Sequence, residues 1–154
     1  MTTKELREEI AIELELMATT AKEVHLLLDD LSGREPTVRE KTAAAAFIAQ
    51  FYGGVENILK RIHRYYGVPM PIGESWHIEV FRRFCKPGFP TLPQLFDDAL
   101  AADLSPFRKF RHVVHHGYGF QLEWDRMKEG LEAVENVHDR LVIALTEFMQ
   151  KLPT

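Results

Sequence analysis

Three long stretches of this sequence carry apolar residues at every third or fourth position, and this spacing most limits the folds open to the chain. Such steps place side chains on one face of an α-helix, whereas a half-buried strand would alternate every second residue. The stretches run over about Thr3–Leu31, from beyond Pro36 to before Gly67, and over about Glu123–Lys151. The sequence therefore predicts three long helices that each bury one face.

Shorter helices are expected between the second and third of these stretches. Ser75 is a good N-cap for a short helix that reaches about Lys86, and another short helix covers Leu95–Ala102. Ser105 followed by Pro106 predicts the start of a further helix, which Gly117 and Gly119 end. With 154 residues, the chain suits a single domain over residues 1–154. The predicted fold is all-α, an antiparallel bundle of three long helices plus short helices.

Composition limits the classes of function. The single cysteine, Cys85, cannot form an internal disulfide, and no apolar run is long enough to cross a bilayer. The charged N-terminus does not resemble a signal peptide, so we expect a cytoplasmic protein without a membrane partner. A net charge of −4 disfavours indiscriminate nucleic-acid binding. The basic residues nevertheless cluster, which predicts a local site that binds anions. The clusters are Lys60, Arg61, His63 and Arg64; Arg82, Arg83 and Lys86; and Arg108, Lys109 and Arg111.

The chemistry-bearing residues concentrate in one segment, Phe110–Phe120. Arg111 carries a permanent charge and a forked set of donors that suits phosphate oxygens. His116 can exchange a proton near neutral pH, and Tyr118 can donate to phosphate or stack on a base. An arginine, a histidine and a tyrosine near a helix end therefore predict phosphate binding combined with proton transfer. RNA cleavage without a metal requires this combination.

Several alternatives remain open from the residue types. The segment could be a solvated helix face, or His112, His115 and His116 could bind a metal, although no nearby carboxylate completes that site. We therefore assign no metal and no cofactor. Glu56 either pairs with Arg111 or is a surface charge. His138 falls on the core stripe of the last helix and is expected to be a core or interface residue. His63 and His77 flank the proline loop, where either could touch RNA, although we expect neither to have a special role.

The spacing Arg111-x4-His116-x-Tyr118 resembles the Arg-x4-His-x-Tyr motif of the HEPN superfamily, specifically of its HepT-like ribonuclease toxins. The Tyr52–Glu56 segment and the position of the motif before the last long helix are also similar to that family, so the resemblance covers most of the chain. One departure is His112, where many members carry a small polar residue, often asparagine. His112 or His115 could therefore share the proton-transfer role with His116.

The resemblance implies a homodimer in which the motifs of two subunits face one cleft, or a higher assembly with an antitoxin. It implies a metal-independent endoribonuclease toxin of a type VII-like HEPN/MNT toxin–antitoxin system that cleaves tRNA or mRNA. Arg111 would stabilise the phosphate and His116 would act as general base or acid, with His112 and His115 beside the substrate and Glu56 in support. Tyr118 would accept AMP from an MNT-type minimal nucleotidyltransferase, which is the antitoxin.

Two other readings compete with this one. A catalytically silent HEPN domain would only bind a nucleotide or the partner nucleotidyltransferase. An unrelated helical bundle would serve as a structural interaction module. It would be a monomer in solution, or a dimer whose interface does not involve Arg111.

Overall fold

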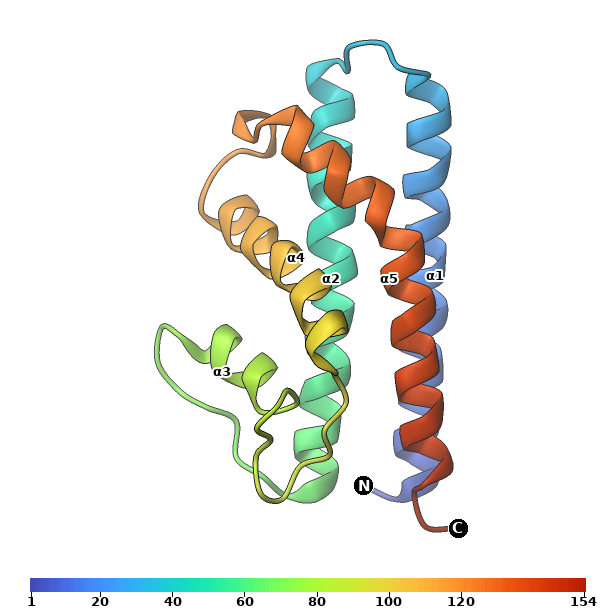
Figure 1. Ribbon diagram of the computed structural model, residues 1–154, viewed down its shortest axis with the longest axis vertical. Coiled ribbons are helices and arrows are strands. Elements are labelled where there is room, and N and C mark those ends of the chain that lie inside the picture. The colour runs from blue at the N-terminus through green and yellow to red at the C-terminus, as the bar shows by residue number, and fades with distance from the viewer.

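The computed structural model describes residues 1–154 and contains helices without any strand. The elements are α1 (Thr3–Leu31), α2 (Val38–Tyr66), α3 (Trp76–Arg82), α4 (Asp98–His116), the 3₁₀ turn η1 (Gly119–Gln121) and α5 (Trp124–Gln150). In Figure 1, α1, α2 and α5 lie side by side, and both termini lie at the same end of the bundle. The predicted all-α antiparallel bundle is confirmed.

Local sequence signals place the ends of the long helices. Thr2 and Glu5 form a capping box at the start of α1, and Thr37 and Glu40 form one at the start of α2. Each box satisfies backbone N–H groups that have no partner inside the helix. The predicted bounds of α1 are confirmed, and those of α5 differ only because the expected end residues, Glu123 and Lys151, are its caps.

The glycine pair in α2 marks close contacts. A Cβ on Gly54 would lie 2.5 Å from Cγ of Met17, so α1 packs against α2 at a distance that only glycine permits. A Cβ on Gly53 would lie 3.8 Å from Nε of Arg111, which is ordinary van der Waals contact. Gly54 thus serves helix packing, while Gly53 faces the arginine of the motif.

The prediction of two separate helices between 95 and 117 was wrong, because α4 is continuous from Asp98 to His116. Its N-cap is Asp97, whose side chain accepts a hydrogen bond from the backbone N–H of Leu100. Pro106 lies inside the helix, where it lacks the N–H that would bond one turn back. Ser105 does not cap a helix and instead donates its hydroxyl to the carbonyl of Ala101.

The other short elements also differ from expectation. The helix that begins after Ser75 ends at Arg82, four residues before the predicted Lys86. Gly117 does follow the last residue of α4, but it is extended, with φ −154°. Gly119 begins η1, and a Cβ on it would lie 2.6 Å from Cβ of Ala45 on α2. The turn after α4 is therefore pressed directly against α2.

The core lies between the long helices, and α2 runs through its centre, in contact with every other element. Its largest fully buried side chains are aromatic: Phe51, Tyr52, Phe84, Phe96 and Phe107. Burial of such rings is the main favourable contribution to folding a chain of this size. None of the helices combines the length and the apolar composition that a membrane span requires.

Candidate functional site

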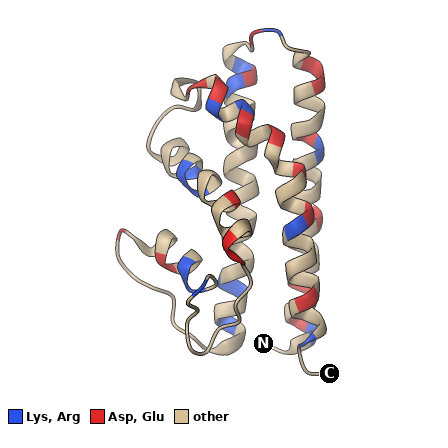
Figure 2. Ribbon diagram, viewed as in Figure 1, with Lys and Arg blue, Asp and Glu red and all other residues tan.

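A cavity of about 350 Å³ opens between α2, the start of α3 and the second half of α4. Its wall is rich in cationic and titratable side chains and includes a single carboxylate, Glu74. Figure 2 shows why α4 supplies this character, since acidic residues lie at its first turns and basic residues lie further along. The lining residues are Tyr52, Glu74, His77, Ile78, Arg108, Lys109, Arg111, His112, Val113, His115 and His116.

Arg111 is held in this wall by Glu56 of α2. The Nε atom of Arg111 lies 3.1 Å from Oε1 of Glu56, as an ion pair without the alignment of a hydrogen bond. Glu56 is only 1% exposed, and a buried carboxylate requires compensating charge or donors. Of the two readings left open for Glu56, the structure shows the ion pair.

His77, the second residue of α3, is the other partner of Glu56. Its Nδ1 contacts Oε2 of the carboxylate, and its side chain remains 29% exposed at the cavity. The ring of Trp76 packs on the imidazole, with the ring centroids 3.5 Å apart. The sequence alone places His77 beside the proline loop and predicts no special role for it. No local signal could have revealed this contact, because the partners are 21 positions apart on different helices.

The histidines of the motif lie on the last turns of α4. The rings of His112 and His116 are neighbours, with centroids 4.5 Å apart, as their spacing of four predicts. His115 also lines the cavity, and all three side chains are exposed. The helix α4 continues through His116, so all three histidines lie on regular helix. Arg111 and all three histidines are thus brought to one wall.

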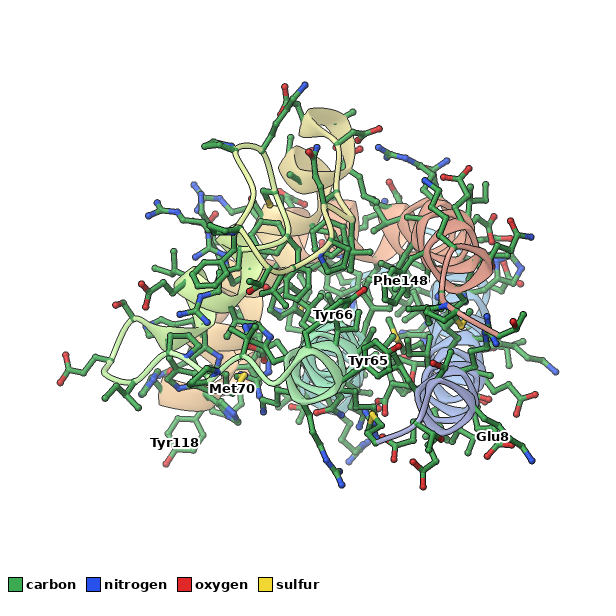
Figure 3. All side chains as sticks on the ribbon, turned by 90° about the horizontal axis from the view of Figure 1, so that it is seen from below. Glu8, Tyr65, Tyr66, Met70, Tyr118 and Phe148 are labelled. Carbon is green, nitrogen blue, oxygen red and sulfur yellow. The ribbon has the colours of Figure 1, made fainter.

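Tyr118 is not brought into the cavity. It is 68% exposed and stacks on Phe120, with ring centroids 5.4 Å apart. In Figure 3 the Tyr118 side chain projects from the edge of the molecule into solvent. The backbone N–H of Tyr118 donates to Oε1 of Gln121, which holds the chain in its turn after α4. Within one chain, Arg111 and His116 therefore line the cavity, whereas Tyr118 points into solvent outside it.

Two polar atoms beside the cavity have no hydrogen-bond partner, the hydroxyl of Tyr52 and Nε of Arg108. Burial raises the pKa of Tyr52, and the neighbouring Glu56 carboxylate raises it further, so the phenol stays protonated and can donate. Unpartnered buried polar groups are uncommon, and both of these groups are hydrogen-bond donors.

The remaining histidines singled out in the sequence lie elsewhere. His63 is buried, its Nδ1–H donates to the carbonyl of Leu59, and its Nε2 accepts from Arg83. His138 is buried on α5 beside Phe51, and its Nδ1 has no partner. Burial lowers the pKa of both imidazoles. Both are core residues.

The three basic clusters do not share one site. Only Arg108, Lys109 and Arg111 line this cavity. Arg61 pairs with Glu9 and Glu13 on α1, and Lys60 lies over the ring of Trp76. No group of three or more His, Cys, Asp or Glu side chains is placed to hold a metal ion.

The profile of a protein family described as HepT-like protein matches residues 43–152. The chain belongs to the HepT-like family. The matched range includes Glu56, His77 and the whole Arg111–Tyr118 segment, so every residue of the cavity lies within the family domain. No curated protein and no solved structure matches the chain. The HepT-like assignment thus makes this a HEPN-type helical domain.

Proposed function

We propose that this HepT-like chain is a metal-independent endoribonuclease, the toxin of a toxin–antitoxin pair, and that it cleaves tRNA or mRNA. The observation that carries the proposal is the wall of α4, on which Arg111, His112, His115 and His116 line one cavity above the buried Glu56. A cationic cavity with several imidazoles suits a substrate that carries negative charge and must exchange protons.

The residues take separate roles in this proposal. Arg111, oriented by Glu56, contacts the scissile phosphate and stabilises the negative charge that accumulates as the RNA 2′-oxygen attacks phosphorus. His116 transfers a proton as general base or acid, and the adjacent His112 and His115 contact the substrate. The attack forms a 2′,3′-cyclic phosphate, and the bond from phosphorus to the 5′-oxygen breaks.

A cleavage assay on total tRNA and a messenger transcript, with EDTA present, tests this function. The parent protein is expected to cleave, whereas Arg111→Ala and His116→Ala should each lose about 100-fold or more in rate. His25→Ala is the matched control, since His25 is exposed on α1 and pairs with Asp29. Equal cleavage by the parent and both motif variants would sink the proposal.

The active form is proposed to be a homodimer, in which the motifs of two subunits face one cleft. Val113, Tyr118 and Phe120 are apolar side chains exposed near the motif, at 44%, 68% and 45%, and they support a contact there. Such an arrangement would place the Tyr118 of one subunit toward the site of its partner.

Tyr118 is also the proposed site of neutralisation by an MNT-type nucleotidyltransferase antitoxin. Its phenolic oxygen would attack the α-phosphorus of ATP, form a phosphodiester to AMP, lose its proton to water, and release pyrophosphate. The exposure of Tyr118 supports access by a second enzyme. Coexpression with an MNT-type nucleotidyltransferase should add the mass of one adenylate to the parent and none to Tyr118→Phe. Modification of the phenylalanine variant would contradict this assignment.

The position of Tyr118 favours a second candidate function, a silent HEPN domain that binds a nucleotide or the partner nucleotidyltransferase. Within one chain the tyrosine lies outside the cavity, so the motif triplet is not assembled. Stable binding of the partner by an unmodified protein that cleaves no RNA would select this candidate.

A further inference from the structure

His77 lies in the cavity wall outside the Arg111–Tyr118 segment, and two neighbouring side chains hold its ring. Its Nδ1 contacts the buried Glu56, and its ring packs on Trp76, which in turn lies under the ammonium of Lys60 at 4.8 Å. These contacts fix the ring on two sides. Contact with a carboxylate that is only 1% exposed distinguishes His77 from an ordinary surface histidine.

The contact with Glu56 determines which ring nitrogen is free. An ionised carboxylate can only accept, so Nδ1 of His77 carries a proton and donates it to Oε2. In the neutral ring, Nε2 then holds a lone pair on the side opposite Glu56. His77 lines the cavity, so its ring borders the space that a bound substrate would occupy. The same carboxylate would stabilise the imidazolium that forms when Nε2 accepts a proton.

Charged and titratable groups surround His77 from each neighbouring element. Glu56 and Lys60 lie on α2, Glu74 precedes α3, and the groups on α4 are Arg108, Lys109, Arg111, His112, His115 and His116.

We infer that His77 is the general base of this site, with Glu56 as its orienting carboxylate and His116 as the general acid. The inference rests on the proposed ribonuclease function. Nε2 of His77 takes the proton of the RNA 2′-hydroxyl, and the 2′-oxygen forms a bond to the adjacent phosphorus. The bond from phosphorus to the 5′-oxygen breaks, and that oxygen receives a proton from the His116 imidazolium. Glu56 then serves two residues, holding Arg111 at the phosphate and His77 at the hydroxyl.

The decisive variant is His77→Asn, compared with His77→Ala. The amide nitrogen of asparagine occupies the place of Nδ1 and keeps the donation to Glu56, but no group replaces Nε2. We expect His77→Asn to slow cleavage at saturating RNA by about 100-fold or more. It should bind a fully 2′-O-methylated copy of the same RNA within about threefold of the parent, since only a transition-state interaction is lost.

The pH profile separates proton transfer from a structural role. The parent is expected to lose rate at acidic pH as its base is protonated. Loss of the base should remove this fall, while the fall expected at alkaline pH from loss of the general acid remains. His25→Asn, on exposed α1 surface, is the matched control for a histidine-to-asparagine change and should keep the parental rate and profile. Thermal unfolding of each variant shows whether it is folded.

The outcomes are distinguishable. If the parent cleaves and His77→Asn cleaves equally well, the role of His77 is overturned and the ribonuclease proposal stands. If His77→Asn is active and only His77→Ala is slow, His77 merely positions Glu56 and Arg111, which also overturns the inference. A parent that leaves every RNA intact overturns the ribonuclease function and the role of His77 together.

Discussion

Glu56 joins two cationic or titratable side chains from different helices, Arg111 on α4 and His77 on α3. The sequence offered the first pairing as one of two readings of Glu56, the other being a surface charge. It did not suggest the second, since nothing local distinguishes His77 from other surface histidines. The spacing of a motif thus predicts candidate site residues along one helix. The side chains on other helices that contact them depend on how the helices pack.

At the same scale, the adjacent residues Gly53 and Gly54 allow a matched comparison of how a glycine-to-alanine change affects the free energy of unfolding. Gly54→Ala should lower the free energy of unfolding by about 1–2 kcal/mol, because its Cβ would lie 2.5 Å from Cγ of the buried Met17. Gly53→Ala should raise it by up to about 1 kcal/mol, since the new methyl meets nothing closer than 3.8 Å and alanine favours helix.

Urea denaturation of both variants measures these differences. A Gly54→Ala protein as stable as the parent would contradict the tight contact between α1 and α2. The Gly53→Ala variant controls for the general gain of replacing glycine in a helix.

At the scale of the element, α4 shows where local rules mislead. Ser105 before Pro106 is a good start signal, but the helix begins eight positions earlier, at the stronger N-cap of Asp97. The buried Leu100, Leu104 and Phe107 share one face across the predicted break, so their packing holds the helix continuous through Pro106. Continuity matters for function, because it fixes the direction in which the last turns carry Arg111 and His116.

The position of the N-cap gives a prediction. Asp97→Ala should lower the free energy of unfolding by about 1 kcal/mol, because the N–H of Leu100 loses its acceptor at the helix start. Ser105→Ala should change it by less, since its hydroxyl only returns to a carbonyl that the helix already uses.

Chemical denaturation compares the two variants under the same conditions. A larger loss for Ser105→Ala than for Asp97→Ala would restore the two-helix interpretation of this segment.

At the scale of the whole molecule, buried histidines make stability depend on pH. Burial lowers the folded-state pKa of His63 and His138 below the ordinary value of 6.5. The unfolded chain therefore binds more protons, so stability is fully present above 6.5 and is lost as pH falls from there toward the folded values. The carboxylate Glu40, whose pKa its partner Arg34 lowers to about 2, contributes stability that is lost only as pH falls below 4.5.

Thermal unfolding between about pH 7.5 and pH 5 therefore reports mainly on the histidines. The parent Tm should fall across this range, and His138→Leu should reduce the fall, because it removes a buried imidazole whose Nδ1 has no partner. The same variant should be more stable at pH 5 by about 1 kcal/mol. An unchanged pH dependence in His138→Leu would contradict the prediction, because it would mean that burial does not lower the folded-state pKa of His138.

The sequence by itself determined the helical class, the extents of α1 and α5, and the helix that carries Arg111 and His116, because periodicity, caps and residue spacing are local properties. Tertiary structure alone decided that α4 is one helix, that Glu56 is buried between Arg111 and His77, and that Tyr118 points away from the cavity. Each of these depends on contacts between helices far apart in the chain. The free energy of burying an apolar helix face or a charged side chain depends on the residues that pack against it, and those residues lie far away in the sequence.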